Sequence, residues 1–203
     1  MKIALIGATG NMGQRLVKEA TSRGHEVIAI SRNPDAAKGG KVTTVALDLH
    51  DENKLADAIK DADVVIQSVR FQDTDPTKVL WAMRKAGKKR LAIVGGAASL
   101  MNQDNIRLLD TPGFPDFIAV EARPAANALD MMRKDARDLD WVFVSPSMML
   151  GPGERTGKFR KGQHHLLTAE DGKSSISYED LAVAILDELE NPTTHGDRFT
   201  VGY

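Results

Sequence analysis

The sequence predicts a doubly wound α/β fold, in which helices cover both faces of one parallel sheet. Three observations lead to this class. Short runs rich in valine and isoleucine lack polar alternation, which is typical of strands buried on both faces. Longer amphipathic segments alternate with these runs, and such helices provide the crossovers that parallel neighbours require. A chain of 203 residues can bury one sizeable core and is short for two, so we expect a single domain over residues 1–203.

Seven short apolar runs are expected to form the strands. They are residues 2–6, 26–30, 42–47, 63–69, 90–95, 141–145 and 197–203. Five amphipathic segments are expected to form helices, at residues 11–23, 51–60, 76–86, 120–138 and 178–190. Ser177 and Asp180 make a capping-box-like start for the last helix, and Pro192 follows its end. Residues 146–168 are basic and rich in glycine and proline, so we predict an irregular excursion over the carboxyl edge of the sheet.

Composition excludes several classes of protein. The net charge of −1 and the 42% of hydrophobic residues are ordinary for a globular domain, so neither a nucleic-acid nor a membrane partner is predicted. Without cysteine the chain has no disulfide, thiolate catalysis or cysteine-bound metal. His164 and His165 would point to opposite faces of a strand, so no metal site is expected. The apolar run after Lys2 is too short for a signal peptide, and a cytoplasmic location is expected.

A glycine turn lies between the first strand and the first helix, in "GATGNMG". Gly7 would allow the tight turn, Gly10 would let a pyrophosphate approach the backbone, and Gly13 would let the helix pack closely on the strand. Free N–H groups at the start of the helix would then face the anion. The candidate cofactor-binding residues of this turn are Gly7, Thr9, Gly10, Asn11, Met12 and Gly13.

The second strand bears on the choice between the two nicotinamide dinucleotides. An NAD site places a carboxylate near the end of this strand to bind the ribose 2′-hydroxyl. Here the strand ends at Ser31 and Arg32, and no acid follows until Asp35. A guanidinium pairs with a 2′-phosphate, so Arg32 favours NADP(H), although NAD(H) stays open and Arg32 can also be a plain surface charge. Further candidates end the fourth and fifth strands, at the edge where such folds bind ligands: Ser68, Val69, Arg70, Gly95 and Gly96.

The glycine turn resembles that of the extended and atypical short-chain dehydrogenase/reductases. "GGAASL" (95–100), "LLDTPGFP" (108–115), "PGERTGKFRKG" (152–162), "SSISYEDLAVAILDELE" (174–190) and "RFTVGY" (198–203) are similar to the NADH-flavin reductase group of the atypical members, which is related to biliverdin reductase B and to NmrA-like proteins. The resemblance implies an NAD(P)-binding Rossmann fold. It also implies that Asp48 and the backbone of Leu49 contact the adenine and that Pro146 lies beside the nicotinamide. By the residues alone, Asp48 or Asp51 could equally cap the next helix.

The usual proton donor of short-chain dehydrogenases is missing. These enzymes carry Tyr-x-x-x-Lys on the helix after the fifth strand, whereas this chain has Phe117 in that region, no lysine before Lys134, and tyrosines only at 178 and 203. Carbonyl reduction by that acid is therefore disfavoured, and no catalytic residue is assigned. A planar conjugated acceptor spreads its new charge and needs no strong acid. We expect reduction of a free flavin or a similar planar small molecule, with the flavin as substrate.

Several side chains near the expected ligand edge are candidates for contact with such a substrate. They are Ser99, Phe114 and Met148, with Met149 and Phe159 as further candidates for an apolar wall. Arg155 could meet a flavin phosphate, but a salt bridge that holds the excursion is the favoured interpretation; Tyr178 is expected to pack at its helix. The main alternative is a non-catalytic NADP-binding redox sensor of the NmrA-like kind. A nucleotide-sugar isomerase or epimerase is a weaker alternative, because such enzymes generally keep the tyrosine and add a larger C-terminal domain.

Overall fold

The apolar runs form the centre of an eight-stranded sheet in the computed structural model, which describes residues 1–34 and 41–203. The strand order is β3-β2-β1-β4-β5-β6-β10-β8, and only the pairing of β8 with β10 is antiparallel. Asp35 lies outside the described residues. This order reverses direction between β1 and β4, as in a Rossmann-like fold, and confirms the predicted class. The strands are β1 (Lys2–Ile6), β2 (Glu26–Ser31), β3 (Val42–Ala46), β4 (Val64–Gln67), β5 (Arg90–Val94), β6 (Asp140–Pro146), β8 (Arg160–Gly162) and β10 (Asp197–Gly202).

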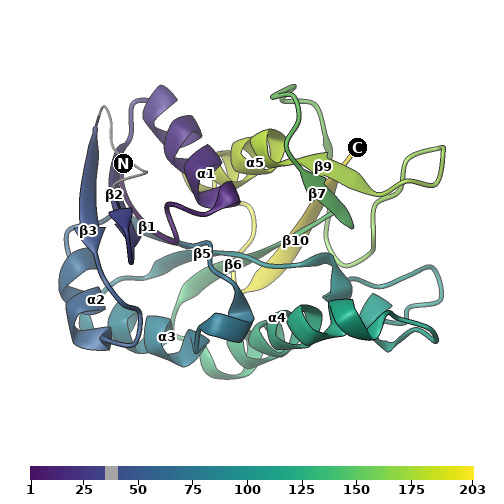
Figure 1. Cartoon of the computed structure of the whole chain (residues 1–203), viewed down its shortest axis with the longest axis horizontal. Helices are drawn as coiled ribbons and strands as arrows, with labels where there is room; N and C mark the ends of the chain where they lie inside the picture. Colours follow the sequence, from purple (N-terminus) through teal and green to yellow (C-terminus); the bar gives the residue numbers. More distant parts are fainter. Residues whose placement is uncertain (35–40) are drawn as a thin grey trace.

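Helices cover both faces of the sheet (Figure 1). One face carries α1 (Asn11–Ser22) and α5 (Tyr178–Glu190), and the other carries α2 (Glu52–Ile59), α3 (Pro76–Lys85) and α4 (Asp116–Asp135). In β1, Ile3 and Leu5 belong to the apolar cluster under α1 and α5, while Ala4 and Ile6 belong to the cluster on the opposite face. Because side chains alternate along a strand and both faces are buried, the central strands show no polar alternation in sequence.

Helix α4 differs from the prediction at both ends. It begins at Asp116, four residues before the expected start, and ends at Asp135 rather than near residue 138. The preceding Pro115 has φ −65° and stands at the N-cap, and Asp116 adds an acidic side chain to the first turn, where the helix dipole favours it. "GFP" in the sequence indicates a loop, but the proline is compatible with a helix that starts directly after it.

The excursion predicted for residues 146–168 is less irregular than expected. It contains β8 and the short strand β7 (Met149–Gly151), which pairs in parallel with β9 (Ser175–Ser177). In addition, β8 extends the main sheet by pairing with β10. These three-residue strands depend on partners far along the chain, which explains why local sequence patterns do not predict them.

Polar contacts with the start of α5 hold part of this excursion in place. The buried carboxylate of Asp180 accepts hydrogen bonds from the backbone N–H groups of Thr156 and Gly157, both at 2.8 Å, and from the Tyr203 hydroxyl at 2.9 Å. The Ser177 hydroxyl accepts from the Asp180 N–H at 2.9 Å and caps the helix, as the sequence predicts. The Asp180 carboxylate therefore holds residues 156 and 157, in the loop that follows β7, to the start of α5.

Candidate functional site

Two cavities lie at the carboxyl edge of the sheet, on either side of the glycine turn. The larger has a volume of about 1020 Å³ and the smaller about 430 Å³. Both are lined by Gly10, Ser68, Val69 and Arg70, so they meet at the point where the strand order reverses between β1 and β4. Together they form an elongated trough with room for a ligand that has two bulky ends and a narrow middle.

The absence of a side chain has a different physical basis at each glycine of the turn. Gly7 has φ +86°, and a Cβ there would lie 2.1 Å from the carbonyl oxygen of Ser68. A Cβ on Gly13 would lie 2.1 Å from the carbonyl oxygen of Gly7, so close packing of α1 excludes any side chain. At Gly10 the nearest atom would be 3.4 Å away and φ is −70°. The fold therefore requires Gly7 and Gly13, whereas a Cβ at Gly10, where the two cavities meet, would make only an ordinary van der Waals contact.

The start of α1 adds an electrostatic feature to this meeting point. No side chain caps the helix, and its first turn holds no acidic residue. Unsatisfied N–H groups and the positive end of the helix dipole make such a terminus favourable for an anion.

The smaller cavity is lined by two basic side chains besides Arg70. Arg32, from the end of β2, and Lys78, from α3, both line it, together with Asp48 and Leu49 after β3. Lys78 was not among the sequence candidates, because it is nine residues beyond the end of the fourth apolar run and is typical of a surface charge. The Lys78 ammonium donates to the carbonyl oxygen of His50 at 3.2 Å.

Asp48 and Asp51 have separate structural contacts at the start of α2. The Asp51 carboxylate caps the helix by accepting from the Lys54 N–H at 3.1 Å. Asp48 accepts from the backbone N–H of His50 at 3.0 Å and does not cap the helix. Asp51 is therefore the residue that caps α2, and Asp48 lines the smaller cavity.

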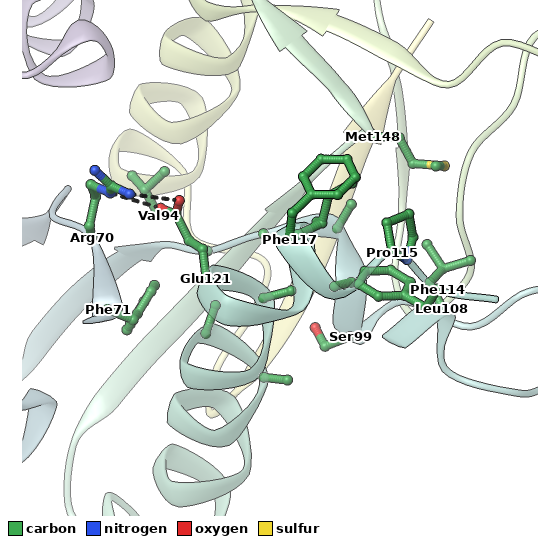
Figure 2. Close-up of a pocket in the computed structure, with 18 of the residues that line it drawn as sticks. Arg70, Phe71, Val94, Ser99, Leu108, Phe114, Pro115, Phe117, Glu121 and Met148 are labelled. Atoms are coloured by element: carbon green, nitrogen blue, oxygen red, sulfur yellow. Dashed lines mark hydrogen bonds and ion pairs between the residues drawn. The ribbon is translucent and has the colours of Figure 1, made fainter. Parts of the chain in front are cut away.

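The walls of the larger cavity are mostly apolar (Figure 2). Phe114 and Pro115 come from the loop before α4, Phe117 and Ile118 from its first turns, and Met148 from the segment after β6. Phe117 and Met148 are 82% and 61% exposed, so their apolar surfaces face open solvent at the rim. A planar conjugated molecule could be held between such surfaces.

Glycines form part of the floor of this cavity. A Cβ on Gly95 would lie 1.9 Å from a ring carbon of Phe143, because that buried ring occupies the space directly behind the glycine. A Cβ on Gly96 would meet nothing within 4 Å. Gly95 is therefore required by the core, whereas Gly96 leaves space in the cavity.

An ion pair lies between the end of β4 and helix α4. The guanidinium of Arg70 donates two hydrogen bonds to the Glu121 carboxylate, at 3.2 and 3.1 Å (Figure 2). Both side chains are more than half exposed, so the pair contributes little to stability. Arg70 and Glu121 line the larger cavity, and Glu121 was not among the sequence candidates.

Helix α4 presents no Tyr-x-x-x-Lys pair to the cavity. None of the pairs of lining residues four apart on this helix combines a tyrosine with a lysine; they are Phe117/Glu121, Ile118/Ala122, Glu121/Ala125 and Ala122/Ala126. Among the lining residues that the structure describes, the only tyrosine is Tyr178 and there is no lysine. Tyr178 also packs against the core, with the Arg15 guanidinium 5.4 Å from its ring centre. The cavity thus lacks the amine that lowers the pKa of a catalytic tyrosine.

Most predicted site residues line one of the two cavities, and two do not. Gly13 packs against the turn, and Pro146 is buried at the end of β6 opposite Val201. The smaller cavity is lined by Gly7, Thr9, Gly10, Arg32, Asp48, Leu49, Ser68, Val69 and Arg70. The larger cavity is lined by Gly10, Asn11, Met12, Ser68, Val69, Arg70, Gly95, Gly96, Ser99, Phe114 and Met148.

Two of the further candidates for the apolar wall were wrong. Met149 belongs to β7 and lines a separate surface cavity, and Phe159 packs against the core. Met149 was expected in a loop, whereas it belongs to β7, which pairs with β9; Phe159 lies in the loop just before β8, with its side chain against the core. Arg155 forms the predicted salt bridge, donating to the Glu19 carboxylate at 2.7 Å.

The two adjacent histidines have different neighbours. His164 lies 3.5 Å from the Asp197 carboxylate, and His165 forms a hydrogen bond with Asn105 at 2.8 Å. No group of three or more potential metal ligands occurs in the described ranges 1–34 and 41–203.

No helix within the described part of the chain has the length and apolar character needed to cross a bilayer.

Comparisons with known proteins match this geometry. A family model described as NAD(P)H-binding matches residues 7–192. The chain is 36% identical over 212 residues to the uncharacterized protein YwnB of Bacillus subtilis, covering 99% of this chain and 98% of YwnB. A candidate NADH-flavin reductase of Streptococcus pneumoniae superposes with a TM-score of 0.86 at 34% identity, covering 100% of this chain and 99% of the other. A candidate epimerase of Bacteroides thetaiotaomicron superposes with a TM-score of 0.94 at 35% identity, covering 100% of this chain and 96% of the other.

The family match spans the glycine turn, both cavities and α5, and full-length relatives share the whole arrangement of strands and helices. The resemblance to atypical short-chain dehydrogenase/reductases is thereby confirmed. The chain belongs to the NAD(P)H-binding family, a family of oxidoreductase type built on a Rossmann-like fold.

Proposed function

We propose that the protein is a reductase that uses NADPH in preference to NADH and passes hydride to a free flavin or a similar planar acceptor. The observation that carries this proposal is the trough itself. Its narrow point is bare of side chains at Gly10, its smaller cavity is basic, and its larger cavity is open and apolar without a tyrosine–lysine pair.

The shape and charges of the trough fit a nicotinamide dinucleotide. The diphosphate would lie at Gly10 and the start of α1, where open space and free N–H groups coincide. The adenosine half would occupy the smaller cavity beside Asp48 and Leu49, with its 2′-phosphate near Arg32 and Lys78. The nicotinamide would then extend into the larger cavity, towards Gly95 and Gly96.

The larger cavity offers orientation rather than strong acid catalysis. When bound, the reduced dinucleotide supplies a hydride, that is, two electrons and one proton. The apolar side chains of Phe114, Phe117 and Met148 would hold a flat acceptor against it, and proximity would supply much of the rate. The open mouth would let water deliver the second proton. A cytoplasmic location is part of this proposal, since reduced dinucleotide is supplied there.

A second candidate is a non-catalytic NADP-binding sensor. It is favoured by the exposed apolar surface on the first turns of α4, where Phe117, Ile118 and Val120 are 82%, 44% and 66% exposed. Such a surface could contact a regulatory partner when the dinucleotide is bound.

One experiment separates the two candidates. Purified protein is mixed with NADPH or NADH, and the loss of nicotinamide absorbance is followed with and without FMN, FAD or riboflavin. Turnover well above the uncatalysed rate supports the reductase. Tight NADP binding without turnover of any acceptor favours the sensor.

The preference for NADPH is tested by replacing Arg32. Because a charge-assisted hydrogen bond contributes about 1.5–3 kcal/mol, Arg32→Gln should weaken NADPH binding roughly ten- to hundredfold and leave NADH binding nearly unchanged. The matched control is Arg84→Gln, since Arg84 is an exposed arginine on α3 paired with Asp138 and outside both cavities. Calorimetric titration with both dinucleotides gives the affinities. Equal losses for NADPH and NADH would remove the assignment of a phosphate contact to Arg32.

A further inference from the structure

Arg198, on β10, is a buried cation without a carboxylate partner. Its side chain is 1% exposed, and it forms no ion pair with any residue that the structure describes. Its Nη1 donates to the Ser99 hydroxyl at 2.8 Å, its Nη2 donates to the carbonyl oxygen of His164 at 3.3 Å, and its Nε has no partner. The nearby Asp197 carboxylate pairs instead with Arg133 at 2.8 Å. Burial lowers the pKa of Arg198 to about 10, so the guanidinium is still charged at neutral pH.

The surroundings of Arg198 do not explain its presence by stability. Thr200 lies two residues beyond Arg198 on β10, so both face the same side of the sheet, and Ser145 of β6 is paired with Thr200. Neither hydroxyl has a hydrogen-bond partner within residues 1–34 and 41–203. A buried charge that is not balanced costs free energy, and replacing such groups with apolar side chains is often neutral or stabilising. A charged residue at this position therefore points to a role outside folding.

Arg198 is connected to the larger cavity through its hydrogen bond to Ser99. Ser99 closes the short helix η3 (Ala97–Ser99) after β5, is 6% exposed, and lines the cavity (Figure 2). Because its oxygen accepts the hydrogen bond from Arg198, its O–H is left to be donated. No described residue accepts a hydrogen bond from that hydroxyl. Withdrawal of charge by the guanidinium makes the Ser99 O–H a stronger hydrogen-bond donor.

We propose that Arg198 is a positioning residue that fixes Ser99 as a hydrogen-bond donor and stabilises the negative charge that reduction places on the acceptor. This inference rests on the proposed reductase function and narrows its substrate class. In the step concerned, a C–H bond of the reduced nicotinamide breaks, both of its electrons and the proton pass to the acceptor, and the acceptor becomes an anion that later takes a proton from water. Preferred acceptors are planar molecules whose added charge rests on an oxygen or ring nitrogen that can reach Ser99.

Variants at both positions separate this role from a structural one. The variants are Arg198→Met, which keeps the length and removes the charge, Arg198→Lys, which keeps the charge, and Ser99→Ala. Since loss of one donor to a developing anion costs up to a hundredfold or more in rate, Arg198→Met and Ser99→Ala should lower kcat roughly ten- to hundredfold with KM for NADPH unchanged. Arg198→Lys should restore part of the rate, and the double variant Ser99→Ala/Arg198→Met should be no slower than the slower single variant.

Two measurements besides turnover complete the test. Arg198→Met should unfold at the same temperature as the unaltered protein or higher; marked destabilisation together with loss of NADP binding would assign Arg198 a structural role and overturn the inference. The second measurement titrates 4-nitrophenol into protein loaded with NADP⁺ and follows phenolate absorbance. The unaltered protein should bind the phenolate more tightly than the phenol, and Arg198→Met and Ser99→Ala should lose that preference.

The two proposals can fail separately. Absence of turnover with every acceptor would refute the reductase, while the phenolate titration would still decide the role of Arg198. Turnover that is unchanged in Arg198→Met, or equal binding of phenol and phenolate by the unaltered protein, would overturn the role of Arg198 and leave the reductase standing.

Discussion

Gly10 and Gly13 lie three residues apart, but the absence of a side chain has a different basis at each. At Gly13 a Cβ would collide with the backbone of the turn, so the glycine is a packing requirement. At Gly10 the backbone is extended and ordinary, and a Cβ would have room. The fold would accept a side chain at position 10, so the glycine there is best explained by the close approach of a ligand. Variants at Gly10 and Gly13 test that explanation.

Replacing Gly10 with aspartate should separate folding from ligand binding. Aspartate is a favoured N-cap, and its charge complements the helix dipole, so Gly10→Asp should keep or raise the unfolding temperature. The same charge would repel a diphosphate, so affinity for NADP should fall at least about tenfold, as expected for a like-charge contact of more than 1.4 kcal/mol. Thermal unfolding and calorimetry give both quantities.

The matched variant is Gly13→Ala, in the same turn. Its Cβ must displace backbone atoms, so it should lower the free energy of unfolding by about 1–3 kcal/mol. If Gly10→Asp binds NADP as tightly as the unaltered protein, the diphosphate does not lie at Gly10.

At the scale of elements, a buried carboxylate connects the end of α5 with the sheet. Glu188 accepts from Arg90 on β5 at 3.0 Å and from Lys161 on β8 at 2.6 Å. It also accepts from the backbone N–H groups of Thr193 and Thr194 after the helix, at 2.9 and 2.7 Å. Burial on its own would raise the pKa of Glu188, but these hydrogen bonds, led by that of Lys161, outweigh it and hold the pKa at about 2.

The low pKa of Glu188 predicts how stability depends on pH. The ordinary value is 4.5, so the stabilising contribution is fully present above pH 4.5 and is lost as the pH falls through about 2. Glu188→Gln should cost roughly 2–3 kcal/mol at pH 7, after allowance for solvent screening, and much less near pH 2. Urea unfolding of both proteins across this pH range measures the difference.

The control for nonspecific effects of low pH on stability is Asp171→Asn, because the exposed ion pair of Asp171 with Lys173 should contribute little to stability at either pH. A cost of Glu188→Gln that stays constant from pH 7 to pH 2 would show that its charge does not stabilise the fold.

The elements that the sequence predicts are those with local causes. Strands β1, β2, β4 and β5 carry apolar side chains on both faces, so the sequence alone indicates them. Asp51 and Ser177 cap α2 and α5, and these caps are also visible in the sequence. The sequence does not predict the start of α4 at Asp116, because Gly113 and Pro115 directly before it are typical of loops. Strands β7, β8 and β9 form only through distant partners, and no short pattern indicates them.

The same distinction holds for the candidate site. Residues of the glycine turn and of the strand ends follow from their order along the chain. Lys78, Glu121 and Arg198 were missed because each is an isolated charge that the tertiary fold brings to the trough or behind it. Arg198 in "DRFTVGY" reads as a strand-edge charge, and only its burial beside Ser99 shows otherwise.

At the scale of the whole molecule, a ligand that fills both cavities should stabilise the protein. A ligand that binds only the folded state at a hundredfold excess over its dissociation constant adds about 2.7 kcal/mol. For a domain of this size that corresponds to a rise of about 5–10 °C in the unfolding temperature. Scanning calorimetry with NADP at such an excess measures the shift.

The control for this shift is Arg32→Gln at the same NADP concentration, which should show a smaller rise. Adenosine alone should give less than the dinucleotide, because it fills only the smaller cavity. An unfolding temperature that does not change with NADP would argue against the trough as the binding site.

The ring of Phe143 directly behind Gly95 means that the cavity floor and the hydrophobic core are separated by a single layer of backbone. A smaller side chain at position 143 would hollow the protein immediately below the ligand, without altering any side chain that faces it. The core side chain behind Gly95 thus determines the depth of the larger cavity, and core substitutions offer a way to change which molecules bind there.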